Sequence, residues 1–445
     1  MQDDENAAIG QTVTESPHLR SYSLARDSPS FVYPARNHSS FVIFLPMHLT
    51  FHRSIFWAHL ISGLLAGLVI LSMSVSGLMI AYEVQLMDWI NRDLRVTPPS
   101  AEAVHLDVET LVARVQEGKP GLSPTGFTWK ADPGAPVTLS VGREGHFYAN
   151  PYTGEFLGEG NHTWHDFFHD VTSWHRFLTG TGLSKEAGKL ITGSGTLIFG
   201  ILLVSGIYLW WPRHWRWVNV RAVLLFNRKL KGRARDWNWH NVFGFWSAFP
   251  MLFIILTGLI MSFSWANTLL FRATGNEPPP PRTRGPGGPG GPPPGGSMAQ
   301  AGPRNESGAR TPPSASLAGL SPLLTEARAQ VPGWASLSLR LPPKPGDPFP
   351  VMVDRGGRGQ VHLRTMLLLD TAQQKVLPNP DDLSQQNLGR RLRMYSRYLH
   401  TGELFGFLGQ TVAALCTFAA ALLTWTGFAL AWRRFFGKKG KVSAT

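Results

Sequence analysis

Trp57 to Glu83 reads WAHLISGLLAGLVILSMSVSGLMIAYE, and this stretch decides the fold because its pattern recurs later in the chain. From His59 to Ser76 it is almost wholly uncharged, and it is long enough to cross a bilayer as a helix. His59 is followed by Gly63 four residues later and by Gly77 eighteen residues later. Residues four apart share a helix face. We therefore expect the imidazole of His59 to lie beside the groove that Gly63 leaves open. A flat macrocycle needs both an imidazole ligand and such a groove.

The second stretch with this pattern runs from Trp239 to Phe263 and reads WHNVFGFWSAFPMLFIILTGLIMSF. His240 is followed by Gly244 four residues later and by Gly258 eighteen residues later. The likeness continues in two further apolar segments, which end SGIYLWWPR at 205–213 and TGFALAWRR at 426–434. The chain is therefore predicted to be a tandem duplication.

Composition separates this chain from several classes of protein. Its 445 residues carry a formal net charge of +13, but the basic residues crowd beside the apolar segments, which favours a membrane over nucleic acid as the partner. The single cysteine, Cys416, lies inside an apolar segment. Intrachain disulfides, a cysteine-based zinc site and the C-x-x-C-H attachment of a c-type haem are therefore excluded.

Four apolar segments are predicted to span a membrane as helices, at 53–82, 190–211, 239–266 and 407–432. The polar segments between and after them are 83–189, the short basic loop 212–238, 267–406 and the basic tail 433–445. Residues 1–52 lack a clear period and are predicted to be a disordered extension, with Met47 as an alternative start of the chain. The predicted fold class is an all-α membrane domain of four helices plus two small exported α+β domains.

The distribution of charge predicts the orientation. The loop 212–238 carries eight basic residues against the single acid Asp236, and the tail after residue 432 is basic as well. Basic loops stay in the cytoplasm, so both termini are predicted to be cytoplasmic and both long polar segments to be exported.

Each long polar segment is predicted to fold as a helix followed by alternating strands. In the first, the helix is Val108–Gln116 and the strands are Phe127–Lys130, Pro136–Val141 and His146–Asn150. In the second, the helix is Pro322–Gln330 and the strands are Ser336–Leu341, Pro350–Asp354 and Gln360–Leu369. The Pro/Gly-rich insert 275–316 has no period, so we expect it to be disordered and to carry no chemistry.

Four histidines stand at the predicted membrane edges. His59 and His240 begin helices one and three on the cytoplasmic side, and His175 and His400 precede helices two and four on the exported side. Two pairs at corresponding positions are what two bis-histidine haems of the b type need, each bridging one helix from each half. The predicted cofactor-binding residues are therefore His59, His240, His175, His400, Gly63 and Gly244.

Alternatives to this interpretation stay open. His169 and His165 compete with His175 as the outer ligand. Any one of these histidines, taken alone, is explained as well by a hydrogen bond at the membrane interface. A zinc or copper site is a weaker rival, because acidic or thiolate co-ligands are missing from these edges.

Together with Leu-His-Thr-Gly-Glu at 399–403 and Asn-Pro-Tyr-Thr-Gly-Glu at 150–155, these motifs resemble the PepSY-associated transmembrane family of bacterial inner-membrane proteins. The resemblance covers about residues 53–434. It implies PepSY-like exported domains and haem ligands at His59, His175, His240 and His400. Members resemble di-haem reductases that act on ferric siderophores at the periplasmic face, which implies such an activity here.

Two functions follow from the sequence. The first is a haem-dependent oxidoreductase for ferric siderophores, which takes its electrons from the quinol pool or a cytoplasmic reductase because the chain has no G-x-G-x-x-G or P-loop of its own. The second is a non-enzymatic membrane module that binds or regulates a periplasmic partner or peptidase. The lipid bilayer is a partner in both, and nucleic acid in neither.

Overall fold

The structure is a computed structural model, which describes residues 47–141, 145–212, 214–279, 316–342 and 344–437. Residues 1–46 of the predicted disordered extension, most of the Pro/Gly-rich insert and the end of the basic tail lie outside the described residues.

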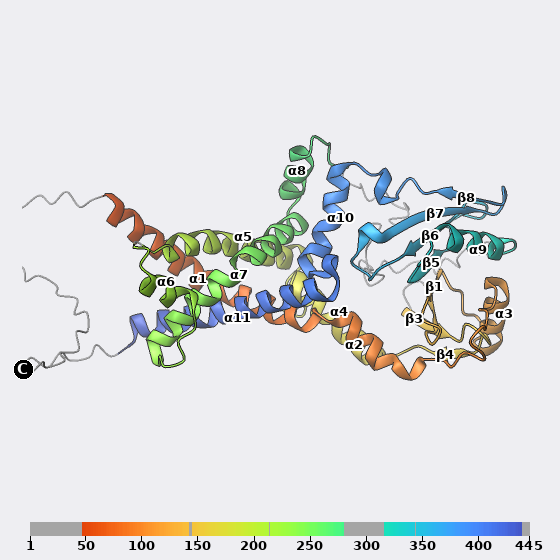
Figure 1. The fold of residues 1–445 in the computed structure, drawn as a ribbon, viewed down its shortest axis with the longest axis horizontal. Coiled ribbons are helices and arrows are strands. Elements are labelled where there is room, and N and C mark those ends of the chain that lie inside the picture. Colours follow the sequence, from red (N-terminus) through yellow and green to blue (C-terminus); the bar gives the residue numbers. More distant parts are fainter. Residues whose placement is uncertain (1–46, 142–144, 213, 280–315, 343, 438–445) are drawn as a thin grey trace, which may run out of the picture. The chain divides into compact units, whose positions relative to one another are not determined.

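Four long helices run side by side in Figure 1: α1 (Met47–Ile80), α5 (Lys185–Trp210), α7 (Gly232–Ser262) and α11 (Gly406–Phe435). Each is long and apolar enough to cross a membrane. Large apolar side chains point outward from them; Leu65, Leu68 and Phe249 are 77%, 72% and 72% exposed. Such a surface suits lipid rather than water, so the prediction of four membrane-spanning helices is confirmed at this level.

Three of these helices begin at least five residues earlier than predicted. Residues 47–52, which were expected to be disordered, already belong to α1. Helix α5 begins at Lys185 because the Ser184 side chain accepts a hydrogen bond from the Ala187 amide and caps the helix. Helix α7 begins at Gly232, within the predicted loop. Apolar content alone therefore underestimated the length of these helices, because their first turns precede the apolar segments.

The strands form one antiparallel sheet in the order β4-β3-β2-β1-β5-β6-β7-β8. The first four are β1 (Gly126–Lys130), β2 (Val137–Val141), β3 (Gly145–Ala149) and β4 (Phe156–Gly158). The second four are β5 (Ser336–Arg340), β6 (Phe349–Asp354), β7 (Arg364–Asp370) and β8 (Lys375–Pro378). The prediction missed the outer strands β4 and β8, which are short.

The two polar segments were predicted as two small domains, and the structure joins their strands in one sheet. Strand β1 pairs with β5 over five residues, with Phe127 opposite Leu339, so both segments share one sheet. Without this pairing both strands would be exposed edges with unpaired backbone groups, and edges of that kind pair readily. Helices α3 (Val108–Gly118) and α9 (Leu320–Gln330) complete a core in which Trp129 is almost wholly buried.

Shorter helices complete the described chain: α2 (Glu83–Ile90), α4 (His162–Phe177), α6 (Trp217–Leu224), α8 (Ser264–Ala273) and α10 (Leu388–Thr401). Helices α4 and α10 matter most, because they carry His175 and His400 near their last turns. Asn161 and Asn387 cap their first turns, and their final turns close on left-handed residues, Leu178 and Gly402. The same local devices therefore set the position of each histidine.

Candidate functional site

The first histidine pair lies near the basic ends of α1 and α7. The imidazole centroids of His59 and His240 are 6.5 Å apart, and the two rings are inclined by 83°. These residues are far apart in the sequence, and the packing of the helices brings them together. We refer to them as the inner pair.

The second pair, the outer pair, lies at the sheet end of the long helices. The ring centroids of His175 on α4 and His400 on α10 are also 6.5 Å apart, with the rings inclined by 66°. The competing residues lie elsewhere: His169 is exposed beside Asp170, and the ring of His165 faces His146. Geometry therefore favours His175 over both rivals as the partner of His400.

Each of the four histidines has a hydroxyl partner on a neighbouring long helix. The partners of Nδ1 are Ser205 Oγ for His59 at 2.9 Å, Thr426 Oγ1 for His240 at 2.9 Å, Ser76 Oγ for His175 at 3.0 Å and Thr257 Oγ1 for His400 at 3.2 Å. Every contact uses the same ring nitrogen.

These hydroxyls determine the tautomer of each histidine. A hydroxyl has one hydrogen to donate and two lone pairs that accept. Ser205, Thr426, Ser76 and Thr257 donate that hydrogen to the carbonyl oxygen four residues earlier, at 2.7, 2.7, 2.7 and 2.6 Å. Each hydroxyl must therefore accept from the histidine, so Nδ1 carries the proton and Nε2 keeps a bare lone pair.

His400 gives an independent check on this assignment. Its Nδ1 also lies 2.9 Å from the backbone oxygen of Ile254, which can only accept. Metal-bound histidines in proteins commonly donate their second ring N–H to such an oxygen, which fixes the orientation of the ring. The ring of His400 thus has the arrangement expected of a ligand.

A glycine follows each of these hydroxyl residues and lies against Cε1 of the same histidine. A Cβ built on it would stand 3.3 Å from His59 at Gly206, 3.7 Å from His240 at Gly427, 3.3 Å from His175 at Gly77 and 3.4 Å from His400 at Gly258. We call Ser205-Gly206, Thr426-Gly427, Ser76-Gly77 and Thr257-Gly258 the Ser/Thr-Gly pairs. One dipeptide thus supplies both the hydrogen bond and the space that each imidazole needs.

Gly63 and Gly244 were expected to form a groove beside the inner pair. A Cβ on either glycine would instead meet a leucine of another helix, Leu202 at 3.8 Å or Leu423 at 3.6 Å. The glycine next to each inner histidine comes from another helix. A role for Gly63 and Gly244 in cofactor binding stays a prediction.

The spacing of each pair suits one metal ion between two imidazoles. Two metal–nitrogen bonds of about 2.0 Å, with about 1 Å more from each nitrogen to its ring centre, give about 6 Å between centroids. Among the described residues, no three His, Cys, Asp or Glu side chains gather at one point. Zinc needs three or four protein ligands, whereas a haem needs only axial ligands from the protein. The donor set therefore fits a haem.

The surroundings of the outer pair keep its imidazoles neutral. Burial, with a smaller contribution from the charge of His400, lowers the pKa of His175 to about 4, and burial lowers the pKa of His400 as well. Neutral imidazole is the form that binds metals. Burial, and then the nearby Arg397, also lower the pKa of Arg176 and of Arg393. Cations therefore gather beside the outer pair, where they suit an anionic group.

Sequence reasoning identified the four histidines but missed the residues that hold them. The dipeptides at 76–77 and 257–258 recur in the sequence, and each ends eighteen residues after a histidine. Their true partners are histidines of other helices, a relation that spacing within one helix cannot reveal.

Comparison with known proteins gives one match. The family model described as the PepSY-associated TM region matches residues 56–434, which cover most of the chain. No curated protein matches the chain significantly.

Proposed function

Because the chain belongs to the PepSY-associated transmembrane family, we propose that its inner and outer histidine pairs each hold one haem b. The common tautomer of the four histidines carries this proposal, since it leaves a bare Nε2 on every ring. When bound, a haem carries one electron at a time. The protein would then be a membrane electron-transfer protein, and its proposed activity is the reduction of ferric siderophores.

The separation of the pairs supports a transfer across the membrane. On α1, His59 of the inner pair and Ser76, which binds His175 of the outer pair, are seventeen residues apart. That spacing corresponds to about 25 Å of helix, close to the hydrocarbon thickness of about 30 Å. On α7 the same spacing separates His240 from Thr257. The chain thus offers one ligand pair near each face.

The orientation belongs to the same proposal. The basic loop and tail would face the cytoplasm of a bacterial cell, and the sheet would face the periplasm as two PepSY-like halves of an internal duplication. The donor of electrons would be a quinol or a cytoplasmic reductase. We favour electron transfer over a non-enzymatic regulatory module because the four histidines form two pairs with 6.5 Å between ring centroids.

The chemistry of the substrate fits this arrangement. Ferric iron is a hard cation that oxygen ligands hold tightly, and ferrous iron is held less well. One electron converts the ferric ion to the ferrous ion and leaves the carrier intact. A quinol that loses two electrons and two protons would serve two ferric ions.

The test uses purified full-length protein in detergent. Its reduced spectrum should show b-type α and Soret bands, and acid acetone should release the haem. After reduction with dithionite under argon, addition of a ferric siderophore should reoxidise the protein and deliver ferrous iron to ferrozine. Protein without haem would end the proposal, and haem that stays reduced with several ferric siderophores would end the reductase part of it.

A further inference from the structure

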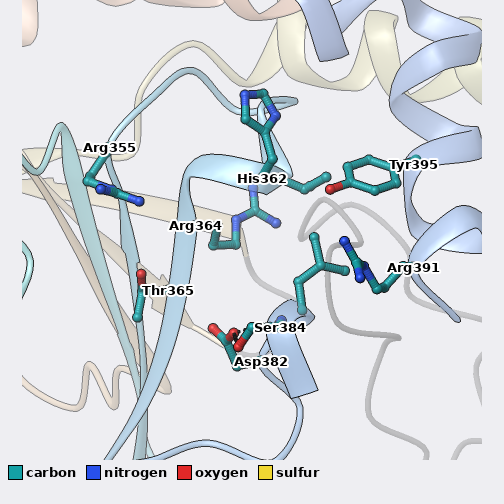
Figure 2. Close-up of a pocket in the computed structure, with 10 residues that line it drawn as sticks. Arg355, His362, Arg364, Thr365, Asp382, Ser384, Arg391 and Tyr395 are labelled. Carbon is teal, nitrogen blue, oxygen red and sulfur yellow. Dashed lines mark hydrogen bonds between the residues drawn. The ribbon is translucent and has the colours of Figure 1, made fainter. Parts of the chain in front are cut away.

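A pocket of about 350 Å³ opens in the second polar segment, away from the histidine pairs. It lies between the end of β6, the start of β7, the 3₁₀ turn Leu383–Gln385 and α10. Figure 2 shows Arg364, His362, Arg391 and the Tyr395 hydroxyl around one space. The volume is near the lower end of the range for small-molecule sites, about 300–1,000 Å³.

The lining is cationic, with three arginines against one carboxylate. Arg364 is buried and paired with Asp354 at 3.2 Å, so its charge is largely balanced. In the described part of the chain, no carboxylate lies within 4 Å of Arg355 or Arg391. Two guanidinium groups therefore remain to bind an anion from solution.

The one acidic residue in the lining, Asp382, is hydrogen-bonded to other residues of the protein. Asp382 Oδ1 accepts from the amide and hydroxyl of Ser384, and Oδ2 accepts from the amide of Met366 at 2.6 Å. Its carboxylate is thus occupied by a turn and a strand. It does not compete with a ligand for the arginines.

The pocket and the outer pair share helix α10. Arg391 and Tyr395 lie on α10, nine and five residues before His400, which is about 14 and 8 Å along the helix axis. Val361 and Leu383 of the lining pack with Tyr398 of α10 in one buried cluster. Helix α10 thus carries residues of both the pocket and the outer pair.

The first half of the molecule has no such positive charge at the corresponding positions. Nine and five residues before His175, helix α4 carries Asp166 and Asp170, whose side chains are 74% and 83% exposed. These carboxylates would repel an anion from α4. An anionic ligand can thus recognise only one of the two helices that end at the outer pair.

We propose that this pocket binds an anionic ferric chelate whose iron is held by oxygen atoms, of the catecholate or hydroxycarboxylate type. The inference rests on the proposed function, and it narrows the substrate from ferric siderophores in general to negatively charged ones. Planar guanidinium forks match paired oxygen atoms of such chelates, and Tyr395 offers a hydroxyl donor beside them. Neutral or cationic hydroxamate chelates lack the charge that the arginines recognise.

The experiment measures binding of redox-inert gallium(III) analogues to the full chain by isothermal titration calorimetry. The gallium(III) complexes of catechol and of citrate should bind, and a cationic gallium(III) trihydroxamate should bind at least about 10-fold more weakly. Arg391→Gln should weaken the anionic complexes by about 10-fold, since a hydrogen bond to a charged group is removed. Tyr395→Phe should weaken them by a smaller factor. Asp166→Asn on α4 is the matched control and should bind like the wild type.

Three results would overturn the inference. The first is equal binding of the anionic and cationic gallium(III) complexes, and the second is wild-type affinity in Arg391→Gln. The third is that free citrate and phosphate bind as tightly as the gallium(III) complexes, which would indicate a general anion site. Arg391 is exposed, so its variant should fold, and unchanged thermal unfolding would verify this. Because gallium(III) accepts no electron under these conditions, binding does not depend on haem. If the gallium(III) complexes do not bind although the haem can still be reduced, the pocket alone is rejected. If they bind to a protein that contains no haem, the proposed function alone is rejected.

Discussion

Helices α4 and α10 each end near a histidine of the outer pair, yet the surfaces that lead to those histidines differ in charge. Helix α4 presents Asp166 and Asp170 where α10 presents Arg391 and Tyr395. The buried contacts of the two histidines are alike, because a Ser/Thr-Gly pair holds each of them.

This difference separates two kinds of constraint. A buried imidazole needs a hydrogen-bond partner and a fitted space, and few residues provide both. A solvent-facing position tolerates many residues, so it can diverge to serve one ligand. The Ser/Thr-Gly contacts that hold the histidines are therefore common to both halves, whereas the cationic pocket belongs to the second half.

The largest expected effect comes from the outer histidines themselves. Helix α4 offers several histidines, whereas α10 offers only His400. His175→Ala and His400→Ala should each remove about half of the bound haem, because one axial ligand of the outer group is lost. His169→Ala is the matched control and should keep the full content. The pyridine haemochrome assay measures this, and full haem content in His175→Ala would refute the outer pair.

A smaller effect is expected from the hydroxyl partners, and here the halves should differ. Ser205→Ala leaves Nδ1 of His59 without its hydroxyl acceptor, whereas Thr257→Val leaves His400 bonded to Ile254. Loss of such a second contact typically costs about 10–100-fold in metal affinity. Haem transfer to apomyoglobin should thus be about 10-fold faster or more for Ser205→Ala and much less affected for Thr257→Val. Equal rates would mean that the hydroxyls do not orient the rings.

The glycines should give a still smaller effect. A Cβ at Gly206 would lie 3.3 Å from His59, tighter than an ordinary contact, whereas one at Gly427 would lie 3.7 Å from His240. Gly206→Ala should therefore displace its imidazole and speed haem loss by a few-fold, since overpacking typically costs about 1–3 kcal/mol. Gly427→Ala tests the same inner pair at an ordinary van der Waals distance and should retain haem normally. Faster loss from Gly427→Ala than from Gly206→Ala would contradict the packing seen here.

Sequence patterns predicted the four long helices, α3, α9 and most strands. They did not predict the shorter helices α2, α4, α6, α8 and α10 or the contacts between the two halves. A run of about eighteen apolar residues predicts a spanning helix from length alone, and alternation predicted the inner strands of the sheet. The pairing of β1 with β5 was not predictable, because Phe127 and Leu339, which face each other, are separated by the whole of α4 to α9. No local pattern encodes a contact at that distance.

The candidate site shows the same limit. The histidines could be found because they recur at corresponding positions of the two halves. His175 was the predicted outer ligand, but His165 and His169 stayed open as rivals because all three lie on one helix. The choice depends on which ring faces His400, a property of how α4 and α10 pack. The pocket was missed for a related reason, since its arginines come from a loop, a strand and a helix, and no pattern within one element groups them.

The smallest expected effect is that of low pH on stability, through a histidine in the first half of the sheet. His146 on β3 has a buried Nδ1 with no hydrogen-bond partner among the described residues, and its ring faces His165, which in turn lies beside Asp166. Burial, and then the charge of His165, lower the pKa of His146 below its ordinary value of 6.5. Strand β7, in the second half, contains no histidine.

The sign of the pH effect follows from this shift. Below about pH 6.5 the unfolded chain binds a proton at His146 that the folded chain resists, so the free energy of unfolding falls as the pH falls. One such group changes it by at most about 1.4 kcal/mol per pH unit. Thermal unfolding in detergent at pH 7.5 and 5.5 should show a smaller loss of stability for His146→Gln than for the wild type. His169→Gln, at an exposed position on α4, is the matched control and should behave like the wild type, whereas an unchanged loss in His146→Gln would show that this histidine is not the acid-sensitive group.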